Sequence, residues 1–226
     1  MKNHHIVTAY LSMLARQSCY AALSLGCLAS PLAAQETASA PTAAAPSYKV
    51  GDTWTIVQRR TDADPGTSYV LTIAAVTEEK TTLSTSWNGG PLKEIDFNNQ
   101  GNMTRDAAGT TYEPSEESLN FPMTVGKTWD FHHLQRSVGG TLDVSGRDEI
   151  VAFEQVQVAA GSFEAFKIVS HGINAKQQVE RLSSVPFTRT YWYAPSVKKV
   201  IKSDYTLYLR PSFRQRSELS AFWLAP

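Results

Sequence analysis

Cysteine is almost absent from this sequence of 226 residues. It occurs only at Cys19 and Cys27, both close to the amino terminus. If the first 34 residues are removed on export, the remaining chain has no cysteine, which excludes disulfides, thiol nucleophiles and cysteine-based metal sites. The exported chain must then be stabilised by its hydrophobic core, and residues 35–226 are enough for one domain with such a core.

Long hydrophobic runs are also absent. The main apolar stretch, Cys19–Leu28, is well short of the roughly 20 residues that a membrane-spanning helix needs. Basic residues and no acidic ones precede it, and small residues follow it, which is the order of a secretory signal. We therefore predict a signal peptide over residues 1–34, cleavage between Ala34 and Gln35, and no transmembrane segment in the mature chain.

The amino-terminal segment leaves two alternatives open. Translation from Met13 instead of Met1 would give a conventional short basic start. Cys27 follows a short apolar and small-residue box and would be the lipidated residue of a lipoprotein. Because the leucines before Cys27 lie one place away from the usual spacing, we favour an unlipidated protein that is periplasmic or secreted.

An excess of charge of either sign is missing too. The chain has 21 basic and 21 acidic residues, and removal of the signal takes away two basic ones, Lys2 and Arg16, which leaves a net charge of −2. Proteins that bind nucleic acid or anionic membrane surfaces carry clusters of basic residues. The sequence therefore predicts neither kind of partner.

The mature chain is dominated by short segments rich in β-branched and aromatic residues, separated by Gly, Asn and Pro, as in antiparallel β-proteins. Residues 35–47 are small and contain proline, so we expect a flexible leader there and one β-rich domain over 48–226. The fold class is all-β, a curved antiparallel sheet or open barrel with few or no helices; the best helical candidate is Ser115–Leu119. The strands are expected at 53–60, 67–76, 81–87, 93–97, 127–136, 141–153, 163–171, 176–184, 187–193 and 198–210.

A seven-residue pattern occurs twice in this domain. The segment Tyr48–Trp54 (YKVGDTW) returns 75 residues later as Met123–Trp129 (MTVGKTW), which repeats the valine, the glycine and the tryptophan. In each copy a glycine suited to a tight turn precedes a strand whose tryptophan would pack in the core. We therefore predict two related halves, 48–120 and 121–210.

Three segments resemble a family of uncharacterised exported bacterial β-rich proteins. They are 121–129 (FPMTVGKTW), 154–168 (EQVQVAAGSFEAFKI) and 190–202 (TYWYAPSVKKVIK). In that family a VPAGTF-like turn and a WYxPxVGxVK-like hairpin often follow an FPLxVGxxW-like entry. The resemblance covers about residues 121–202. It implies a curved sheet or open barrel in the cell envelope and identifies no catalytic residues.

This chain departs from the family pattern at two positions. Ala159 stands where proline is common and Lys199 where glycine is common, which affects local geometry and leaves the chemistry unchanged. The hairpin also contains three aromatic residues in a row, Tyr191, Trp192 and Tyr193. Because neighbouring strand residues point to opposite faces, at least one ring faces away from the others and would line a groove on an uncovered face. We predict these three residues as the ligand-binding residues.

Histidines and acidic residues are the candidates for catalysis or metal binding. His132 and His133 are adjacent on a predicted strand, so their rings point to opposite faces and are poorly placed to share a metal ion. Glu113, Glu116 and Glu117 cluster around a proline but lack the spacing of a calcium loop. Neither group predicts a metal site, and we expect hydrogen-bonded or solvated side chains at both.

Sequence motifs of known enzymes are missing. No serine lies in a G-x-S-x-G motif, and no phosphate-binding glycine loop or dinucleotide fingerprint occurs. The basic residues Lys198, Lys199 and Lys202 are interpreted as a solvated strip along a strand edge, where lysines discourage aggregation. An enzyme is therefore not favoured, and no cofactor is predicted.

The leading functional hypothesis is an exported, non-enzymatic envelope protein. It would bind a small apolar or amphipathic ligand, or a segment of an envelope protein, against a concave aromatic-rich sheet. One alternative is a hydrolase or metal-dependent periplasmic enzyme that uses the regions of His132 and His133 or of Glu113 and Glu116. The other is a structural envelope component that pairs its strand edges with a partner.

Overall fold

The structure is a computed structural model that describes residues 40–178 and 181–226. The predicted signal peptide with its cleavage site at Ala34 and Gln35, the alternative start at Met13 and the candidate lipidation site Cys27 lie outside the described residues. Ordered structure begins before Tyr48, because Thr42–Ala43 forms the strand β1, which pairs with β8 (Met123–Thr124) in a small two-stranded sheet. The prediction of a flexible leader up to residue 47 is therefore wrong for these residues.

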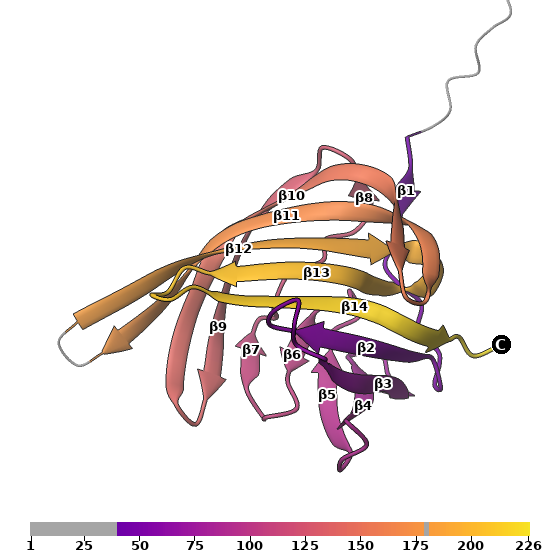
Figure 1. Cartoon of the computed structure of the whole chain (residues 1–226), viewed down its shortest axis with the longest axis horizontal. Coiled ribbons are helices and arrows are strands. Elements are labelled where there is room, and N and C mark those ends of the chain that lie inside the picture. The colour runs from indigo at the N-terminus through magenta and orange to yellow at the C-terminus, as the bar shows by residue number, and fades with distance from the viewer. Residues whose placement is uncertain (1–39, 179–180) are drawn as a thin grey trace, which may run out of the picture. The chain divides into compact units, whose positions relative to one another are not determined.

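The other twelve strands form a closed antiparallel barrel (Figure 1). Most strands pair with the next one in sequence, and the barrel closes because the last strand pairs with the first long one. In ring order the strands are β2 (Thr53–Arg59), β3 (Thr67–Val76), β4 (Thr81–Trp87), β5 (Lys93–Phe97), β6 (Met103–Arg105), β7 (Thr111–Glu113), β9 (Thr128–Ser137), β10 (Gly140–Val158), β11 (Gly161–Gln178), β12 (Arg181–Ala194), β13 (Lys199–Leu207) and β14 (Phe213–Trp223).

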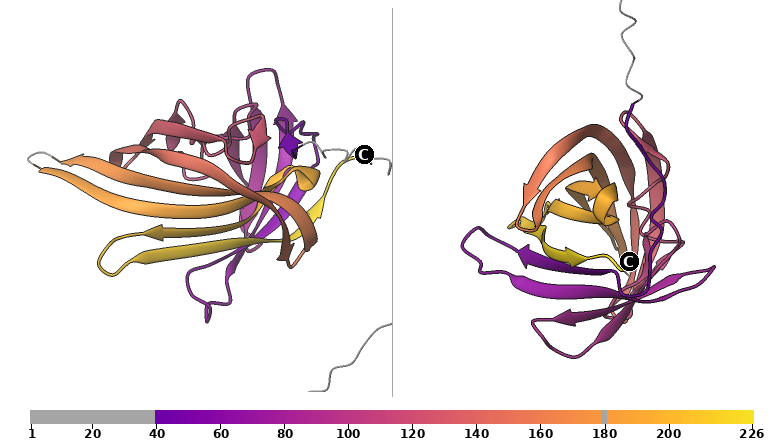
Figure 2. Two further views of the ribbon diagram at one scale, coloured as in Figure 1. Left: turned by 90° about the horizontal axis from the view of Figure 1, so that it is seen from above. Right: turned by 90° about the vertical axis from the view of Figure 1, so that its right-hand side faces the viewer.

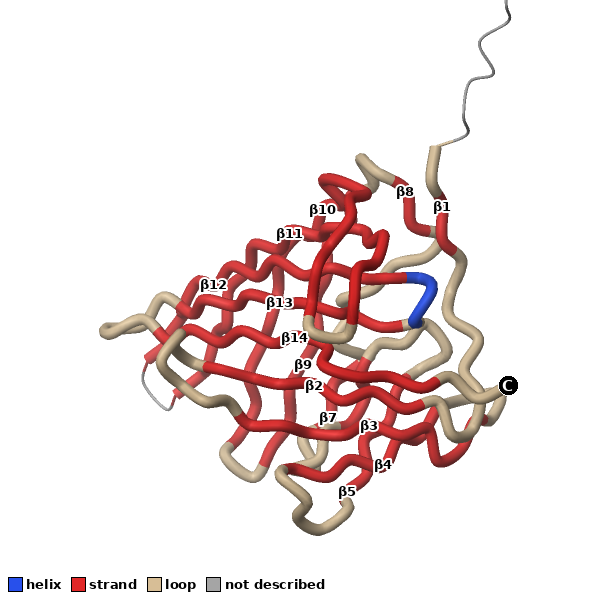
Figure 3. Tube along the Cα trace, turned by 45° about the vertical axis from the view of Figure 1, so that its right-hand side comes forward, coloured by secondary structure: helices blue, strands red, loops and turns tan. Residues whose placement is uncertain are grey.

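The all-β antiparallel prediction is confirmed, and the barrel is closed rather than open. Closure follows from the β14–β2 pairing, which leaves no long free edge between the two ends of the domain. The two views in Figure 2 show the strands curving around a common interior. Among the described residues the helical content is one 3-10 turn, η1 (Pro195–Val197), drawn in blue in Figure 3. None of the described helical residues forms a helix long and apolar enough to cross a membrane.

Several predicted elements differ from the observed ones. Residues 115–119 form no helix. The predicted strand 176–184 is not a separate element, because its first residues continue β11 and its last residues begin β12. The strand β14 was not predicted, because Gln215 and Ser217 on its inner side are polar and the apolar alternation that marks a strand is lost there.

The two copies of the glycine–tryptophan pattern adopt the same local geometry. Gly51 and Gly126 both have positive φ, 95° and 88°, and their N–H groups donate to Ile73 O at 2.9 Å and to Ile150 O at 2.8 Å. Both isoleucines return a hydrogen bond of 2.9 Å to the carbonyl of the residue after the glycine, and a register shift follows directly after each isoleucine. The wider division into halves 48–120 and 121–210 stays a prediction.

The barrel interior contains two apolar clusters. The first is built mainly from β2–β5 and includes the fully buried Trp54, and the second is built mainly from β9–β12 and includes Trp129. Both tryptophans are fixed by their indole N–H groups, since Trp54 donates to Val197 O at 2.8 Å and Trp129 donates to Glu117 O at 3.0 Å. Each cluster therefore holds one connecting segment against the end of the barrel.

Candidate functional site

A cavity of about 290 Å³ lies in the barrel interior, bordered by β2–β6 on one side and by β12 and β13 on the other. Its rim includes Tyr69 and Trp87, whose ring centroids are 4.4 Å apart. Trp87 is 38% exposed, so the cavity approaches the protein surface beside this pair. The apolar wall comes from the inward side chains of β2, β3, β5 and β6: Ile56, Leu71, Ile95, Phe97 and Met103.

The opposite wall contains a partly buried ion pair. Arg189 of β12 and Glu116 of the loop after β7 lie 2.6 Å apart, Nη1 to Oε1, and the Glu116 N–H donates to Met103 O at 2.8 Å, which fixes the loop. The guanidinium of Arg189 also lies 4.5 Å from the centre of the Tyr191 ring. Burial alone would lower the pKa of Arg189, but Tyr191, Glu116 and other nearby groups raise it above its ordinary value. Arg189 is therefore a cation, and the Glu116 carboxylate neutralises its charge.

Tyr191 connects this wall to the core. Its hydroxyl lies 2.7 Å from Asp148 Oδ2 and also contacts the Ser118 carbonyl. Burial raises the pKa of Asp148, and Arg189 offsets this only in part. The Tyr191 hydroxyl donates to the Ser118 carbonyl and to Asp148 Oδ2, so two acceptors share its one proton. This chain of hydrogen bonds joins β10, β12 and the loop that lines the cavity.

Lys199, the first residue of β13, places an ammonium group at the cavity. Its Nζ lies 4.6 Å from the centre of the Phe97 ring and 5.5 Å from that of Trp54, which are cation–π distances. Burial lowers the pKa of Lys199 to about 8, although Glu116 opposes the shift. Within residues 40–178 and 181–226, no carboxylate pairs with this ammonium.

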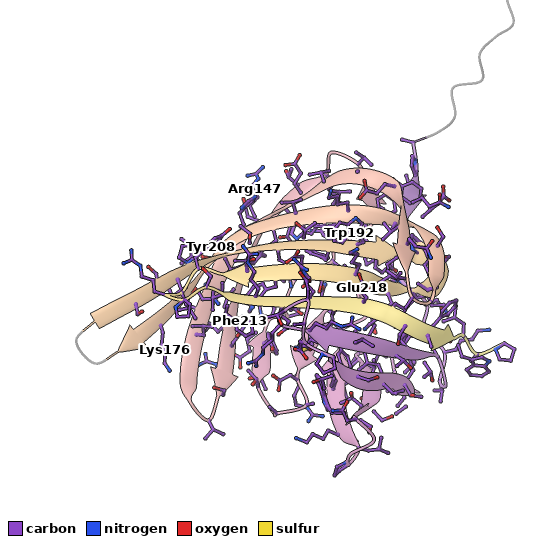
Figure 4. All side chains as sticks on the ribbon, in the orientation of Figure 1. Arg147, Lys176, Trp192, Tyr208, Phe213 and Glu218 are labelled. Carbon is purple, nitrogen blue, oxygen red and sulfur yellow. The ribbon has the colours of Figure 1, made fainter. Side chains whose placement is uncertain are left out.

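The three predicted ligand-binding residues do not lie together. Tyr191 lines the cavity. Tyr193 is also buried, but its ring packs edge-on against Phe121, with 5.3 Å between the ring centroids. Trp192, labelled on β12 in Figure 4, lies on the opposite face of the strand, where its indole N–H donates to Glu154 at 2.8 Å. Of the trio, the structure therefore brings Tyr191 alone to the cavity.

The basic strip is not a solvated strand edge. β13 lies between β12 and β14, and its lysines have three different environments. Lys198 pairs with the buried Asp52 at 2.9 Å, Lys199 faces the cavity, and Lys202 pairs with Glu218 outside at 3.3 Å. The left-handed residue of this turn is Lys198, with φ 57°, so the position suited to glycine is Lys198 and not Lys199.

The histidines and glutamates singled out in the sequence are dispersed. His133 is buried, whereas His132 is exposed and contacts Asp143 at 3.0 Å, as expected for opposite faces of one strand. Glu113 pairs with Arg136 at the surface. In the part of the chain that the structure describes, no three His, Cys, Asp or Glu side chains are grouped to hold a metal ion.

The functional residues that the sequence did not reveal are Arg189, Glu116 as its partner, and Lys199 as a cavity residue. Arg189 and Glu116 are 73 positions apart, so no local pattern connects them. Lys199 carried no clear signal either. A register shift between Val200 and Lys202 interrupts the alternation of β13, and Val200 lines the cavity as well.

Comparison with known proteins gives a likeness in fold. No protein-family model and no curated protein sequence matches the chain. A candidate exported protein with a YmcC-like fold from Bacteroides fragilis superposes with a TM-score of 0.54 at 14% identity, covering 80% of this chain and 99% of that one. At this identity the match shows a shared fold.

Two further solved structures are similar. A candidate lipoprotein from Parabacteroides distasonis has a TM-score of 0.49 at 9% identity and covers 79% of this chain and 97% of its own. The hypothetical lipoprotein YmcC from Escherichia coli K12 has a TM-score of 0.46 at 9% identity, with 78% of this chain and 85% of that chain covered.

Proposed function

We propose that this protein is an exported, non-enzymatic envelope protein that binds a small amphipathic molecule inside its barrel. The observation that carries the proposal is the cavity, which has an apolar wall from β2–β6 and a charged wall from β12, β13 and the loop after β7. Ligand sites in proteins are concave and mostly apolar, with a few placed polar groups. The cavity has this composition, and its volume of about 290 Å³ suits a small ligand.

Export is part of the proposal. It rests on the predicted signal peptide over residues 1–34 and is supported by the description of the Bacteroides fragilis protein as a candidate exported protein. We place the mature protein in the periplasm or outside the cell, and lipidation at Cys27 is the alternative. Membership of the exported family whose signature covers residues 121–202 belongs to the same proposal.

The site also differs from the one that the sequence suggested. A concave outer groove lined by Tyr191, Trp192 and Tyr193 would need all three rings on one surface. Tyr191 instead faces the interior, whereas Trp192 is on the other face between Lys167 and Lys202, 5.5 and 5.8 Å from its ring. The interior therefore supports ligand binding better than the outside of the hairpin.

Native mass spectrometry tests the proposal. The full chain is produced with its own signal, purified gently without detergent, and measured intact. We expect a mass above that of the polypeptide, and extraction into organic solvent should release the bound molecule. The uncharged fluorescent probe N-phenyl-1-naphthylamine should then bind the emptied protein and become brighter.

Two neighbouring substitutions on β13 supply a matched control. Ser203 lines the cavity, whereas Lys202 points outward to Glu218. Ser203→Phe should fill the cavity and abolish probe binding, and Lys202→Phe should leave it intact, with circular dichroism showing that both variants fold. A clean polypeptide mass together with no probe binding would overturn the proposal. Stoichiometric zinc or calcium would favour an enzyme, and one abundant crosslinked partner without a ligand would favour a structural role.

A further inference from the structure

The charges around the cavity are unequal. Arg189 is neutralised by Glu116 at 2.6 Å, and Lys198 is neutralised by Asp52 at 2.9 Å. Lys199 is the remaining cation, and within the described ranges it has no carboxylate partner. The two ion pairs are neutral, so Lys199 gives the cavity one uncompensated positive charge.

The position of Lys199 makes this charge costly. Its ammonium lies over the aromatic faces of Phe97 and Trp54, which replace only part of the hydration that it loses. A buried charge is usually compensated by an opposite charge and hydrogen bonds. Lys199 faces the cavity, so a molecule bound there has room to supply the missing negative charge.

The rest of the cavity restricts what that molecule is. Ser203 and Ser217 line it on the β13–β14 pair, and their hydroxyls are hydrogen-bonded to each other at 2.7 Å, which leaves one hydroxyl proton free to donate to a ligand. The opposite wall is apolar, with Ile56 and Leu71 among its members. A volume of about 290 Å³ is at the low end for small-molecule pockets and is too small for a two-chain lipid or an oligosaccharide.

We infer that the ligand is a single-chain amphipathic acid whose carboxylate binds Lys199 and whose hydrocarbon chain lies along the apolar wall of β2–β6. This inference rests on the proposed function, since it specifies what the cavity binds. The carboxylate supplies the counter-charge for the Lys199 ammonium. An uncharged head group would leave the charge of Lys199 without a counter-charge. A cationic head group would be repelled by it.

The test compares three molecules with the same chain: dodecanoate, dodecanol and dodecylammonium. Each competes with N-phenyl-1-naphthylamine on the full-length protein at neutral pH and below its micelle concentration. We expect dodecanoate to bind about tenfold or more tightly than dodecanol, because a charge-assisted hydrogen bond contributes about 1.5 to 3 kcal/mol. Dodecylammonium should bind most weakly.

Variants of Lys199 separate charge from shape. Lys199→Met keeps the length and apolar contacts of the side chain, so dodecanol and the probe should still bind while the preference for dodecanoate falls to about one. Lys199→Arg should keep the preference. Equal affinity for dodecanoate and dodecanol in the unmodified protein, with the probe bound, would overturn the inference and leave the proposed function intact. So would Lys199→Met if it weakened all ligands equally. Failure of every molecule, the probe included, would overturn the proposed function as well.

Discussion

Two buried aspartates of the barrel interior are stabilised in opposite ways. For Asp52, burial raises the pKa, but hydrogen bonds from Lys198 and from the N–H groups of Lys49 and Ala225 outweigh it, and the pKa is lowered. For Asp148, burial dominates and the pKa is raised. Asp52 is therefore an ionised partner in the folded state, whereas Asp148 holds its proton more tightly when folded than when unfolded.

The two aspartates predict opposite effects of an Asp→Asn substitution. Asp52→Asn breaks a buried pair and should lower the free energy of unfolding by about 3 kcal/mol at pH 7. Asp148→Asn still offers Tyr191 an acceptor oxygen and removes the cost of ionising a buried acid, so it should be neutral or stabilising at pH 7. Urea unfolding of both variants measures this directly.

The pH dependence gives a second readout of the same two groups. The contribution of Asp52 is present above its unfolded pKa and is lost as pH falls through its lower folded value. The raised pKa of Asp148 has the reverse sign, so its contribution declines as pH rises from the unfolded toward the folded value. The advantage of Asp148→Asn over the unmodified protein should therefore grow from about pH 4 upward. A loss of stability at pH 8 would instead show that Asp148 acts as a charged partner of Arg189.

At the scale of elements, the long β10–β11 hairpin contains a glycine pair over which two phenylalanine rings pack. Gly146 and Gly172 are directly opposite each other, and their outer neighbours in the same row are Phe131 of β9 and Phe187 of β12. A Cβ atom at Gly146 would lie 2.5 Å from the Phe131 ring, and one at Gly172 would lie 2.4 Å from the Phe187 ring. The two rings therefore pack over the glycines, where any side chain would displace them.

Alanine at either strand glycine should be strongly destabilising. Gly146→Ala and Gly172→Ala each place a methyl group inside the van der Waals radius of a ring and a backbone carbonyl. We expect a loss of about 2 to 3 kcal/mol in the free energy of unfolding for each, measured by chemical denaturation. Gly139→Ala, in the turn before β10, is the control, because its nearest contact is an ordinary 3.6 Å. Equal stability of all three variants would contradict the proposed packing.

The sequence predicted many elements well and others poorly for one physical reason. Strands β2 and β3 bury alternate apolar residues, Trp54 and Ile56 in β2 and Leu71 and Ile73 in β3, so the sequence shows a clear alternation there. β14 contributes the polar Ser217 to the cavity, and Gln215, two residues earlier, is polar too, so the apolar alternation is lost. The signature hairpin was recognised from its residues, but which of its three aromatic rings reaches the cavity depended on how β12 is oriented in the closed barrel.

At the scale of the whole molecule, the barrel is unevenly held together. β10 and β11 are paired along almost their full length, whereas β6 and β7 are three residues each and are joined through the single pair Arg105–Thr111. Long ladders must open together, but short ones can separate locally. The β5–β7 side is therefore the weakest part of the ring and lies beside the cavity through Met103.

Hydrogen exchange tests this gradient in stability. We expect the amides of β6 and β7 to exchange fastest among the barrel strands and those in the centre of β10, β11 and β12 to exchange slowest, as measured by mass spectrometry of peptic fragments. A ligand in the cavity should slow exchange at β6 in particular. Uniform protection around the ring would show that the barrel opens as one unit.

The sequence by itself determined the all-β class, the antiparallel hairpins and most strand positions, because these depend on alternation and turn residues that are local. Only the tertiary structure decided that β14 closes on β2 and which charges meet inside. Arg189 finds Glu116 across 73 positions and Lys198 finds Asp52 across 146, so their pairing depends on strand register and closure. Lys199 is left facing the cavity for the same reason, since alternation gives a strand two faces and packing decides which one lies inside.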